Sequence, residues 1–191
     1  MIKENGLLVV LSSPSGGGKT TVIKKVIHLN PDYLYSISMT TRSMRTGEEN
    51  GRDYWFVSEE EFAESIKAGN FVEYEKVHGC YYGTPITKIS EWVDQQKIVF
   101  LDLDVYGALR LKEKFENRAL LIFLKPPDEK SLVNRLVNRS TETQQQIEKR
   151  LTRMPEEIKM AEEFDSIVIN EDLDDTIKQV KLIVEKKRST L

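Results

Sequence analysis

The stretch Ser12-Ser-Pro-Ser-Gly-Gly-Gly-Lys-Thr-Thr21 directly follows the apolar run Leu7–Leu11 and precedes a helix-like segment. Its glycines let successive backbone N–H groups point into one concavity, where they and the positive end of the following helix bind phosphate oxygens. In the pattern G-x-x-x-x-G-K-[ST], the lysine reaches the β- and γ-phosphates and the next hydroxyl coordinates Mg²⁺. Lys19 and Thr20 occupy those two places. The sequence therefore predicts a phosphate-binding loop with a nucleotide as its ligand.

Ser13 is the one departure from that pattern, because it stands where the first glycine belongs. If this position requires a positive φ, a serine adds strain. A glycine run can also be a loop without a ligand, but here strand, loop and helix follow in the order that the motif needs. We expect the donor nucleotide to contact the loop residues Ser13, Pro14, Ser15, Gly16, Gly17, Gly18, Lys19, Thr20 and Thr21.

Composition narrows the class of protein. The chain of 191 residues is long enough for one compact domain with insertions and a sizeable core. Its net charge of -3 argues against a general electrostatic hold on nucleic acid, so we expect no nucleic-acid partner. Any anion site must then be a local cluster of basic residues.

The number of cysteines and histidines and the length of the apolar segments argue against disulfide-bonded, zinc-binding and membrane-spanning proteins. The single cysteine, Cys80, leaves no disulfide within the chain, and with two histidines it makes a zinc site improbable. We find no apolar segment long enough to span a membrane, and residues 1–6 lack the parts of a signal peptide. We expect a cytoplasmic protein without a membrane partner; the oligomeric state stays open.

The chain alternates apolar runs with helical patterns. Nearly continuous apolar runs, typical of strands buried on both faces of a parallel sheet, occupy 7–11, 98–103, 120–124 and, more weakly, 166–169. Helical patterns occupy 20–28, 106–115, 129–138 and 175–187. This alternation predicts an α/β core with a parallel sheet flanked by helices.

Two segments interrupt the alternation. Residues 35–87 are rich in Thr, Ser, Gly, Arg and Tyr and predict an inserted mixed α/β subdomain with one helix at 59–68. Residues 128–160 are strongly charged and helical, which predicts a hairpin-like lid. We therefore expect one domain, 1–191, whose P-loop core comprises 1–34, 88–127 and 161–191.

Acidic and basic residues add candidates for a phosphate site. The strand-like run Ile98–Leu101 ends in Asp102 and Asp104, which share a face if the strand continues through both; a carboxylate there can help to hold Mg²⁺ beside the loop. Arg42 and Arg45 offer planar forks that suit phosphate oxygens. The alternative without a functional role is that the two aspartates only solvate the end of a strand and that the two arginines only lie on a solvent-exposed face.

Several motifs in order resemble the guanylate kinase family over nearly the whole chain. They are Ser36-Ile-Ser-Met-Thr-Thr-Arg42, Gly47-Glu-Glu-Asn-Gly-Arg-Asp-Tyr54-Trp-Phe-Val-Ser58, Phe71-Val-Glu73-Tyr, Val77-His-Gly-Cys-Tyr-Tyr-Gly-Thr-Pro85, Leu101-Asp-Leu-Asp-Val-Tyr-Gly-Ala108 and Ile167-Val-Ile-Asn-Glu-Asp-Leu173. The resemblance implies an ATP:GMP phosphotransferase of purine metabolism that uses Mg²⁺ and has a core, a GMP-binding insertion and a lid.

The resemblance also implies which residues bind each substrate. GMP is expected to contact Ser38, Arg42, Arg45, Tyr54, Glu73, Tyr82, Gly83, Thr84 and Asp102, and ATP to contact Asn170 besides the loop. Arg42, Arg45, Tyr54 and Tyr82 hold the GMP phosphate in this view. Glu73 suits guanine, because a carboxylate can accept from both N1–H and the exocyclic amine.

The expected mechanism follows from charge. A phosphomonoester is largely dianionic at neutral pH, so the GMP nucleophile needs no general base. The enzyme must align two anions and stabilise the transferring group. We expect Lys19, Arg45 and the lid arginines Arg135, Arg139 and Arg150 to supply catalytic cations, with Thr20 and Asp102 at the metal.

Departures from the family pattern keep other readings open. The lid has Asn138-Arg139-Ser140-Thr141 where two glycines are usual, Tyr106 replaces a glutamine, and Pro155 predicts a kink or a restart in the returning helix. Related scaffold domains bind protein partners without catalysis, and a sugar-phosphate kinase can share the core. The retained motif residues favour the GMP kinase; a preference between GMP and dGMP is left open.

Overall fold

The core of the protein is a parallel sheet of five strands. The computed structural model describes all residues except 1–5, 15, 78, 129–130, 133–151 and 153. The strand order is β2 (Leu34–Tyr35), β7 (Ile98–Asp102), β1 (Leu7–Ser12), β8 (Ala119–Lys125) and β9 (Ser166–Ile169). All four apolar runs that predicted strands are confirmed. β2 was missed because a strand of two residues has no periodicity to detect.

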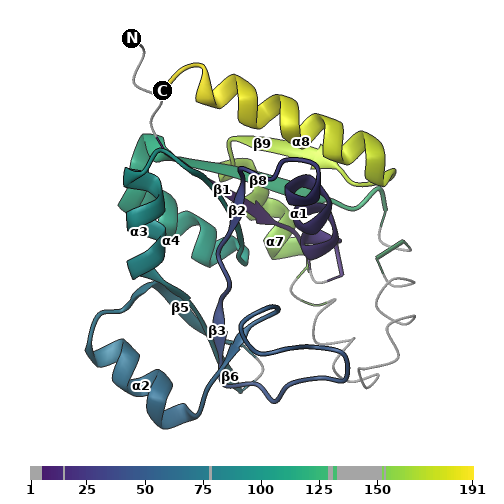
Figure 1. Cartoon of the computed structure of the whole chain (residues 1–191). Coiled ribbons are helices and arrows are strands. Elements are labelled where there is room, and N and C mark those ends of the chain that lie inside the picture. Colours follow the sequence, from purple (N-terminus) through teal and green to yellow (C-terminus); the bar gives the residue numbers. More distant parts are fainter. Residues whose placement is uncertain (1–5, 15, 78, 129–130, 133–151, 153) are drawn as a thin grey trace.

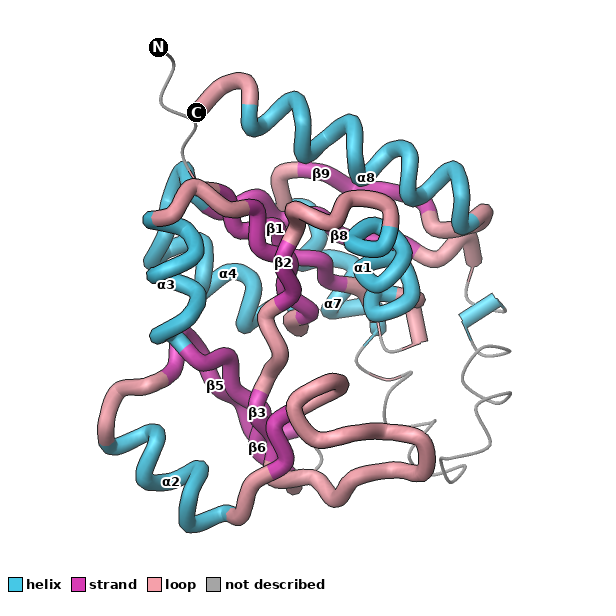
Figure 2. Tube along the Cα trace, viewed as in Figure 1, coloured by secondary structure: helices cyan, strands magenta, loops and turns pink. Residues whose placement is uncertain are grey.

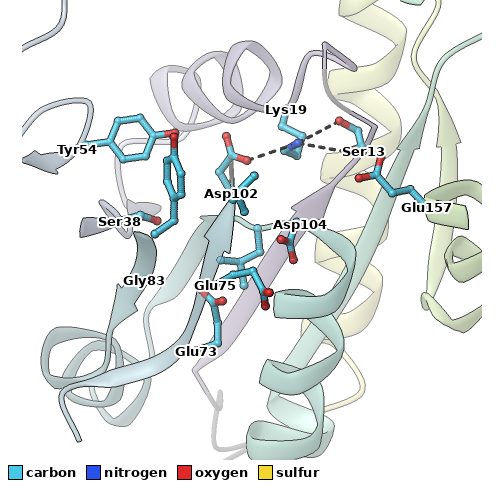
Figure 3. Close-up of a pocket in the computed structure, with 13 residues that line it drawn as sticks. Ser13, Lys19, Ser38, Tyr54, Glu73, Glu75, Gly83, Asp102, Asp104 and Glu157 are labelled. Carbon is cyan, nitrogen blue, oxygen red and sulfur yellow. Dashed lines mark hydrogen bonds and ion pairs between the residues drawn. The ribbon is translucent and has the colours of Figure 1, made fainter. Parts of the chain in front are cut away.

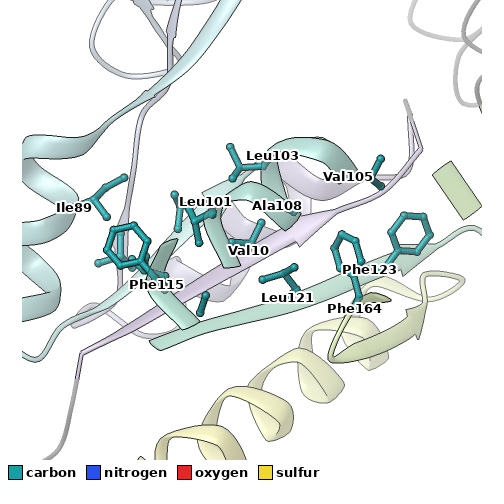
Figure 4. Close-up of a cluster of buried hydrophobic side chains, with 14 of the residues drawn as sticks. Val10, Ile89, Leu101, Leu103, Val105, Ala108, Phe115, Leu121, Phe123 and Phe164 are labelled. Carbon is teal, nitrogen blue, oxygen red and sulfur yellow. The ribbon is translucent and has the colours of Figure 1, made fainter. Parts of the chain in front are cut away.

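Helices cover both faces of this sheet (Figure 1). Side chains of α1 (Lys19–His28) and α8 (Leu173–Arg188) pack on one face, against Leu7, Val9 and Leu11 of β1. Side chains of α3 (Ile86–Asp94) and α4 (Val105–Phe115) pack on the other, against Leu8 and Val10, in the cluster of Figure 4. Burial on both faces explains why the strands read as continuous apolar runs.

Side chains cap the starts of α4 and α8, whereas the starts of α1 and α3 have no side-chain cap. The side chains of Asp104 and Asp172 accept hydrogen bonds from the backbone N–H groups of Gly107 and Asp175, at the starts of α4 and α8. At α1 no side chain caps the start and the first turn holds no acidic residue. The amino end of α1 therefore keeps its positive field for an anion.

A second, smaller sheet lies to one side of the core (Figure 2). Its order is β4 (Trp55–Phe56), β3 (Met39–Thr40), β6 (Cys80–Pro85) and β5 (Phe71–Val77), with only β3 and β4 running parallel. The helix α2 (Glu59–Lys67) starts in a Ser58 capping box and buries Phe62. The Phe62 ring stacks on Phe71 and Tyr81, with centroids 4.6 and 5.3 Å apart. This aromatic stack joins α2 to both long strands.

The carboxyl ends of β1 and β7 lie side by side. The parallel register pairs Leu11 with Asp102. The loop that follows β1 therefore starts next to the carboxylate that ends β7. The strand does not continue to Asp104, which caps α4 instead.

Only the ends of the predicted lid lie within the described residues. The helix α7 (Met154–Met160) begins one residue before Pro155, so the proline sits in the first turn, where its missing N–H costs no hydrogen bond. Residues 133–151 and 153, which precede this helix, lie outside the described residues, so the predicted kink or restart stays a prediction. Leu132 packs on Met154 and Ile158, which brings the two ends of the segment together.

Short 3-10 turns at Glu116–Arg118 and Ala161–Glu163 lead into β8 and β9. Within the part of the chain that the structure describes, no helix is both long and apolar enough to cross a membrane.

The packing predicts unequal costs for the same substitution at two leucines. Leu121 of β8 is fully buried, so Leu121→Ala should lower the free energy of unfolding by about 3 kcal/mol. Leu182, 65% exposed on α8, is the matched control, and Leu182→Ala should change it by less than about 0.5 kcal/mol. Urea unfolding measures both, and equal losses would contradict this packing.

Candidate functional site

The glycine-rich loop after β1 is braced from behind by Asn170. Gly18 has a φ of 92°, and a Cβ at this position would lie 2.6 Å from Asn170 Nδ2, so only glycine fits. That Nδ2 atom donates a hydrogen bond of 2.7 Å to the Gly17 carbonyl, and Thr176 Oγ1 donates to Asn170 Oδ1 at 3.0 Å. Asn170 is buried. Its side chain thus fixes the backbone of the loop.

Ser13 fits the loop without backbone strain. Among described non-glycine residues, only Gln96 and Glu116 have positive φ, so the expected strain at Ser13 is absent. The Ser13 hydroxyl donates to the Pro14 carbonyl at 2.9 Å. Lys19 Nζ donates to the Ser13 carbonyl at 3.2 Å and to its Oγ at 3.4 Å. The serine therefore adds an acceptor beside the lysine of the motif.

Thr20 and Asp102 bring two oxygen ligands together. Thr20 Oγ1 donates to Asp102 Oδ2 at 2.7 Å, and Lys19 Nζ lies 3.9 Å from Asp102 Oδ1. Among the described residues no cluster of three or more His, Cys, Asp or Glu side chains could hold a metal by itself. Mg²⁺ commonly takes only one or two protein oxygens and completes its shell with phosphates and water. A hydroxyl beside a carboxylate fits that ion.

Arg42 is held in place by a carboxylate and two aromatic rings. Its Nη2 donates to Glu48 Oε1 at 2.9 Å, and its guanidinium lies 5.4 and 5.5 Å from the ring centres of Tyr54 and Phe56. The Arg45 backbone N–H donates to Glu48 Oε2 at 2.8 Å. Burial alone would raise the pKa of Glu48, but these hydrogen bonds outweigh it and lower that pKa. Glu48 thus stays charged and holds the side chain of Arg42 and the backbone of Arg45.

A cavity of about 340 Å³ joins the loop to these arginines. Burial raises the pKa of the Tyr54 hydroxyl far above its usual value, with the Asp102 carboxylate adding to the rise, so this phenol stays neutral and can donate to a phosphate. The lining is mostly polar and comprises Gly16, Gly17, Gly18, Lys19, Thr20, Lys24, Tyr35, Arg42, Arg45, Glu48, Asp53, Tyr54, Tyr82 and Asp102.

Two lining residues of this cavity, Lys24 and Asp53, link α1 to the insertion. Lys24 of α1 donates to Asp53 Oδ1 at 2.8 Å, and Arg52 Nε donates to Asp53 Oδ2 at 2.8 Å. The hydrogen bond from Lys24, with help from Arg52, lowers the pKa of Asp53 from 3.8 to about 2. The contact fixes the insertion relative to α1.

A second cavity, of about 250 Å³, continues from the first (Figure 3). Both cavities are lined by Lys19, Tyr54, Tyr82 and Asp102. Carboxylates gather at the far end, where Figure 3 shows Glu73, Glu75 and Asp104 close together. The remaining lining is Ser13, Ser38, Val77, Gly83, Leu103 and Glu157.

Glu73 is a buried carboxyl with a defined hydrogen-bond donor. Thr84 Oγ1 donates to Glu73 Oε1 at 2.7 Å. A Cβ on Gly107 would lie 2.8 Å from Glu73 Oε2, so this glycine makes room for the carboxylate. Burial raises the pKa of Glu73 from 4.5 to about 7, although Thr84 and Arg110 act in the opposite direction. The group therefore stands near its midpoint at neutral pH.

The structure brings most of the predicted site residues together. Those described around the two cavities are Ser13, Gly16, Gly17, Gly18, Lys19, Thr20, Ser38, Arg42, Arg45, Tyr54, Glu73, Tyr82, Gly83 and Asp102, with Thr84 behind Glu73. Pro14 accepts from the Gly17 N–H, and Thr21 is exposed on α1. Ser15, Arg135, Arg139 and Arg150 lie outside the described residues.

The sequence-based selection missed several carboxylates that line the cavities. Glu48 and Asp53 belong to the quoted motif between Gly47 and Ser58, but their partners, Arg42 and Lys24, emerge only from the fold. Asp104 was considered as a strand residue. The spacing Asp104-x-x-Gly107 was the available signal for the helix cap that it forms.

The chain is similar to known proteins over nearly its whole length. A family model described as guanylate kinase matches residues 5–187. The chain is 43% identical over 184 residues to a guanylate kinase of Lactococcus lactis, covering 96% of this chain and 89% of that protein. It is 45% identical over 186 residues to one of Streptococcus mutans, covering 96% and 88%. The crystal structure of guanylate kinase from Anaplasma phagocytophilum superposes with a TM-score of 0.80 at 31% identity, covering 97% and 88%.

The raised pKa of Glu73 predicts a pH-dependent stability of the free protein. Between pH 4.5 and 7 the folded protein binds more protons than the unfolded chain, so the stability that protonation contributes is lost as pH rises through this window. The loss attributable to Glu73 is about 3 kcal/mol. Urea unfolding at pH 5 and 7.5 should show most of this loss in the wild type but not in Glu73→Gln. Substitution of the exposed Glu60 by glutamine is the control, and an unchanged pH dependence in Glu73→Gln would contradict the assignment.

Proposed function

The chain belongs to the guanylate kinase family, which phosphorylates GMP with ATP to give GDP, and we propose that its two joined cavities hold the acceptor and the reacting phosphates together. The carboxylate-lined cavity takes the guanine base, and the loop-lined cavity takes the phosphates. The observation that carries this assignment is the shared boundary: Lys19, Tyr54, Tyr82 and Asp102 line both cavities. A nucleotide that spans them has its base and phosphate in environments of opposite charge.

Glu73 is the residue that we assign to base recognition. An ionised carboxylate accepts from guanine N1–H and from the exocyclic amine, whereas adenine offers an acceptor at N1. Thr84 occupies one oxygen with its donated hydrogen bond and fixes the orientation of the carboxylate. Ser38, Gly83 and Asp102 complete the acceptor-binding residues of this proposal. A mismatched base would leave buried polar groups unpaired, which is costly.

The acceptor phosphate is assigned to Arg42, Arg45, Tyr54 and Tyr82. The Arg42 guanidinium is already oriented by Glu48 and by the Tyr54 ring, so little side-chain freedom remains to be lost on binding. Tyr54 remains a neutral donor because burial raises its pKa. Two phenols and two arginines then surround a phosphate whose oxygen is the nucleophile.

The donor phosphates are assigned to the loop and to the start of α1. Backbone N–H groups of the glycines and the uncapped amino end of α1 supply a positive field. Lys19 supplies the mobile cation, and Ser13, Asp102 and Asn170 hold the lysine and the loop in place. Thr20 and Asp102 are the residues that would hold Mg²⁺, which when bound neutralises charge on the donor phosphates.

The reaction proposed for this arrangement is direct in-line transfer. The GMP phosphate is largely dianionic at neutral pH, so the protein needs no general base to activate it. The contribution of Lys19 and Arg45 is to offset the repulsion between two anions and to stabilise charge on the transferring group. We assign the same role to Arg135, Arg139 and Arg150.

We also propose that the chain divides into a core (1–34, 88–127 and 161–191), an insertion (35–87) and a lid (128–160). Leu132 packs on Met154, and this contact between the two ends of the lid segment supports the division.

Removal of the loop lysine should abolish turnover without unfolding the protein. In a coupled ADP-release assay with Mg-ATP and GMP, Lys19→Ala should lose about 1,000-fold or more in kcat. The reason is that the positive charge of Lys19 stabilises the negative charge on the transferring phosphoryl group more strongly in the transition state than in the ground state. Lys25→Ala, on an exposed position of the same helix, is the control and should retain activity. Near-normal turnover by Lys19→Ala would contradict the loop assignment.

Loss of the Glu73 charge should change the choice of acceptor more than the use of ATP. We expect Glu73→Gln to lower kcat/KM for GMP by about 100-fold or more relative to AMP, because the amide cannot accept from both guanine donors. The KM for ATP should stay within about threefold, since the donor site lies apart from Glu73. Testing GMP, dGMP, AMP, UMP and ribose 5-phosphate in the same assay gives the comparison. Unchanged selectivity would remove Glu73 from the guanine site.

A further inference from the structure

Arg110 places one guanidinium nitrogen between two carboxylates of the acceptor cavity. Its Nη2 lies 2.7 Å from Glu75 Oε2 and 3.8 Å from Glu73 Oε2. Glu73 and Glu75 are two residues apart on β5, so both side chains leave the same face of the strand. Arg110 comes from α4, which packs against that strand. The helix α4 thus places the positive charge of Arg110 beside the carboxylates that line the acceptor cavity.

The three side chains differ in exposure in an informative way. The Glu73 side chain is 7% exposed, whereas Glu75 and Arg110 are 39% and 43% exposed. The nearer pair, Arg110 with Glu75, lies at the rim and orients the guanidinium. The more distant pair, Arg110 with Glu73, reaches into the site. Glu75 therefore holds the Arg110 guanidinium in place, and the positive charge of Arg110 favours the ionised form of Glu73.

The surroundings of Glu73 contain more negative than positive charge. From β6, Thr84 donates a neutral hydrogen bond. From the start of α4, the Asp104 carboxylate opposes ionisation of Glu73, as Glu75 on its own strand does. From the body of α4, Arg110 favours ionisation. Among these described neighbours, Arg110 is the cation that offsets the two anions.

We propose that Arg110 is a positioning residue for base recognition: anchored by Glu75, it keeps the Glu73 carboxylate charged and aimed at the guanine edge. This inference rests on the proposed role of Glu73. The chemistry of the base makes the charge state decisive, because a protonated carboxyl would present an O–H donor to the N1–H donor of guanine. Arg110 touches neither substrate in this account and acts through Glu73.

The proposal predicts a loss of activity that high pH repairs. In Arg110→Gln, kcat/KM for GMP at pH 6.5 should fall about tenfold, the change that follows when the pKa of Glu73 rises by one further unit. The pH profile of kcat/KM should move to higher pH, and the loss should shrink to less than about twofold at pH 9, where Glu73 ionises without help. The GMP phosphate also titrates in this pH range, but it does so equally for every variant, so it cancels when the variants are compared. The kcat at saturating GMP should stay unchanged.

Two further substitutions refine the test. Arg110→Lys keeps the cation and should recover most of the wild-type profile at pH 6.5. Glu75→Gln removes the anchor but also one of the anions that oppose ionisation, so its profile should move less than that of Arg110→Gln. Arg118→Gln is the matched control, because Arg118 is 46% exposed and pairs with Asp94 at 3.3 Å away from both cavities; it should behave as wild type at every pH.

The outcomes separate this inference from the proposed function. If Glu73→Gln loses its selectivity for GMP while Arg110→Gln keeps the wild-type pH profile, the inference fails and the role of Glu73 stands. If Glu73→Gln keeps that selectivity, the role of Glu73 fails, and the inference fails with it. A loss in Arg110→Gln that is equal at pH 6.5 and 9 would show a merely structural role for Arg110 and overturn the inference.

Discussion

The parallel register between β1 and β7 is the constraint on which the site depends. Pairing Leu11 with Asp102 puts the start of the glycine-rich loop beside a carboxylate from a strand almost a hundred residues later in the chain. Thr20 and Lys19 both reach that carboxylate. A slip of one residue would turn the Asp102 side chain to the opposite face of the sheet. The side chains of β1 are fully buried on both faces, and their close packing against particular neighbours opposes such a slip.

Charge is distributed unevenly along the joined cavities. Lysine, arginine and the helix end face the phosphate part, whereas Glu73, Glu75 and Asp104 face the base part. This polarity gives a nucleotide one favoured direction, because its anionic end is repelled by the carboxylates and its donor-rich guanine edge is attracted to them. Burial of Glu73 strengthens its hydrogen bonds to guanine. Burial also raises the pKa of Glu73, so the same low-polarity environment makes the carboxylate harder to keep charged.

Three departures from the family pattern that lie within the described residues are accommodated locally. Ser13 keeps an ordinary backbone conformation and offers its oxygens to Lys19. Tyr106, in place of a glutamine, donates a hydrogen bond to Glu156 of α7 at 2.5 Å and so links α4 to the helix at the end of the predicted lid segment. Pro155 sits where a helix tolerates it. Each change is absorbed within one or two neighbouring elements.

Sequence patterns predicted the parts of the fold that have strong local signals. Continuous apolar runs predicted β1, β7, β8 and β9, and the order of strand, glycines and lysine predicted the loop. The apolar spacing of Ile86, Ile89 and Val93 is a helical signal, and α3 forms there although no helix was predicted. β2 and β3 have two residues each and follow from pairing rather than from pattern.

The residues of the acceptor site were predicted mainly by family resemblance. The electrostatics of that site could not be predicted from the sequence. No local pattern connects Glu73 with Thr84, Gly107 or Arg110, because these contacts join residues that lie far apart in sequence. The buried environment that raises the pKa of Glu73 exists only once β5, β6 and α4 have packed. Such properties depend on tertiary structure and are absent from the sequence pattern.

A crystal structure with GMP bound tests the central claim most directly. The account predicts the guanine N1 and exocyclic amine within hydrogen-bond distance of the Glu73 carboxylate, and the phosphate in contact with Arg42, Arg45, Tyr54 and Tyr82. A base placed away from Glu73, or a phosphate bound without these arginines, would contradict it.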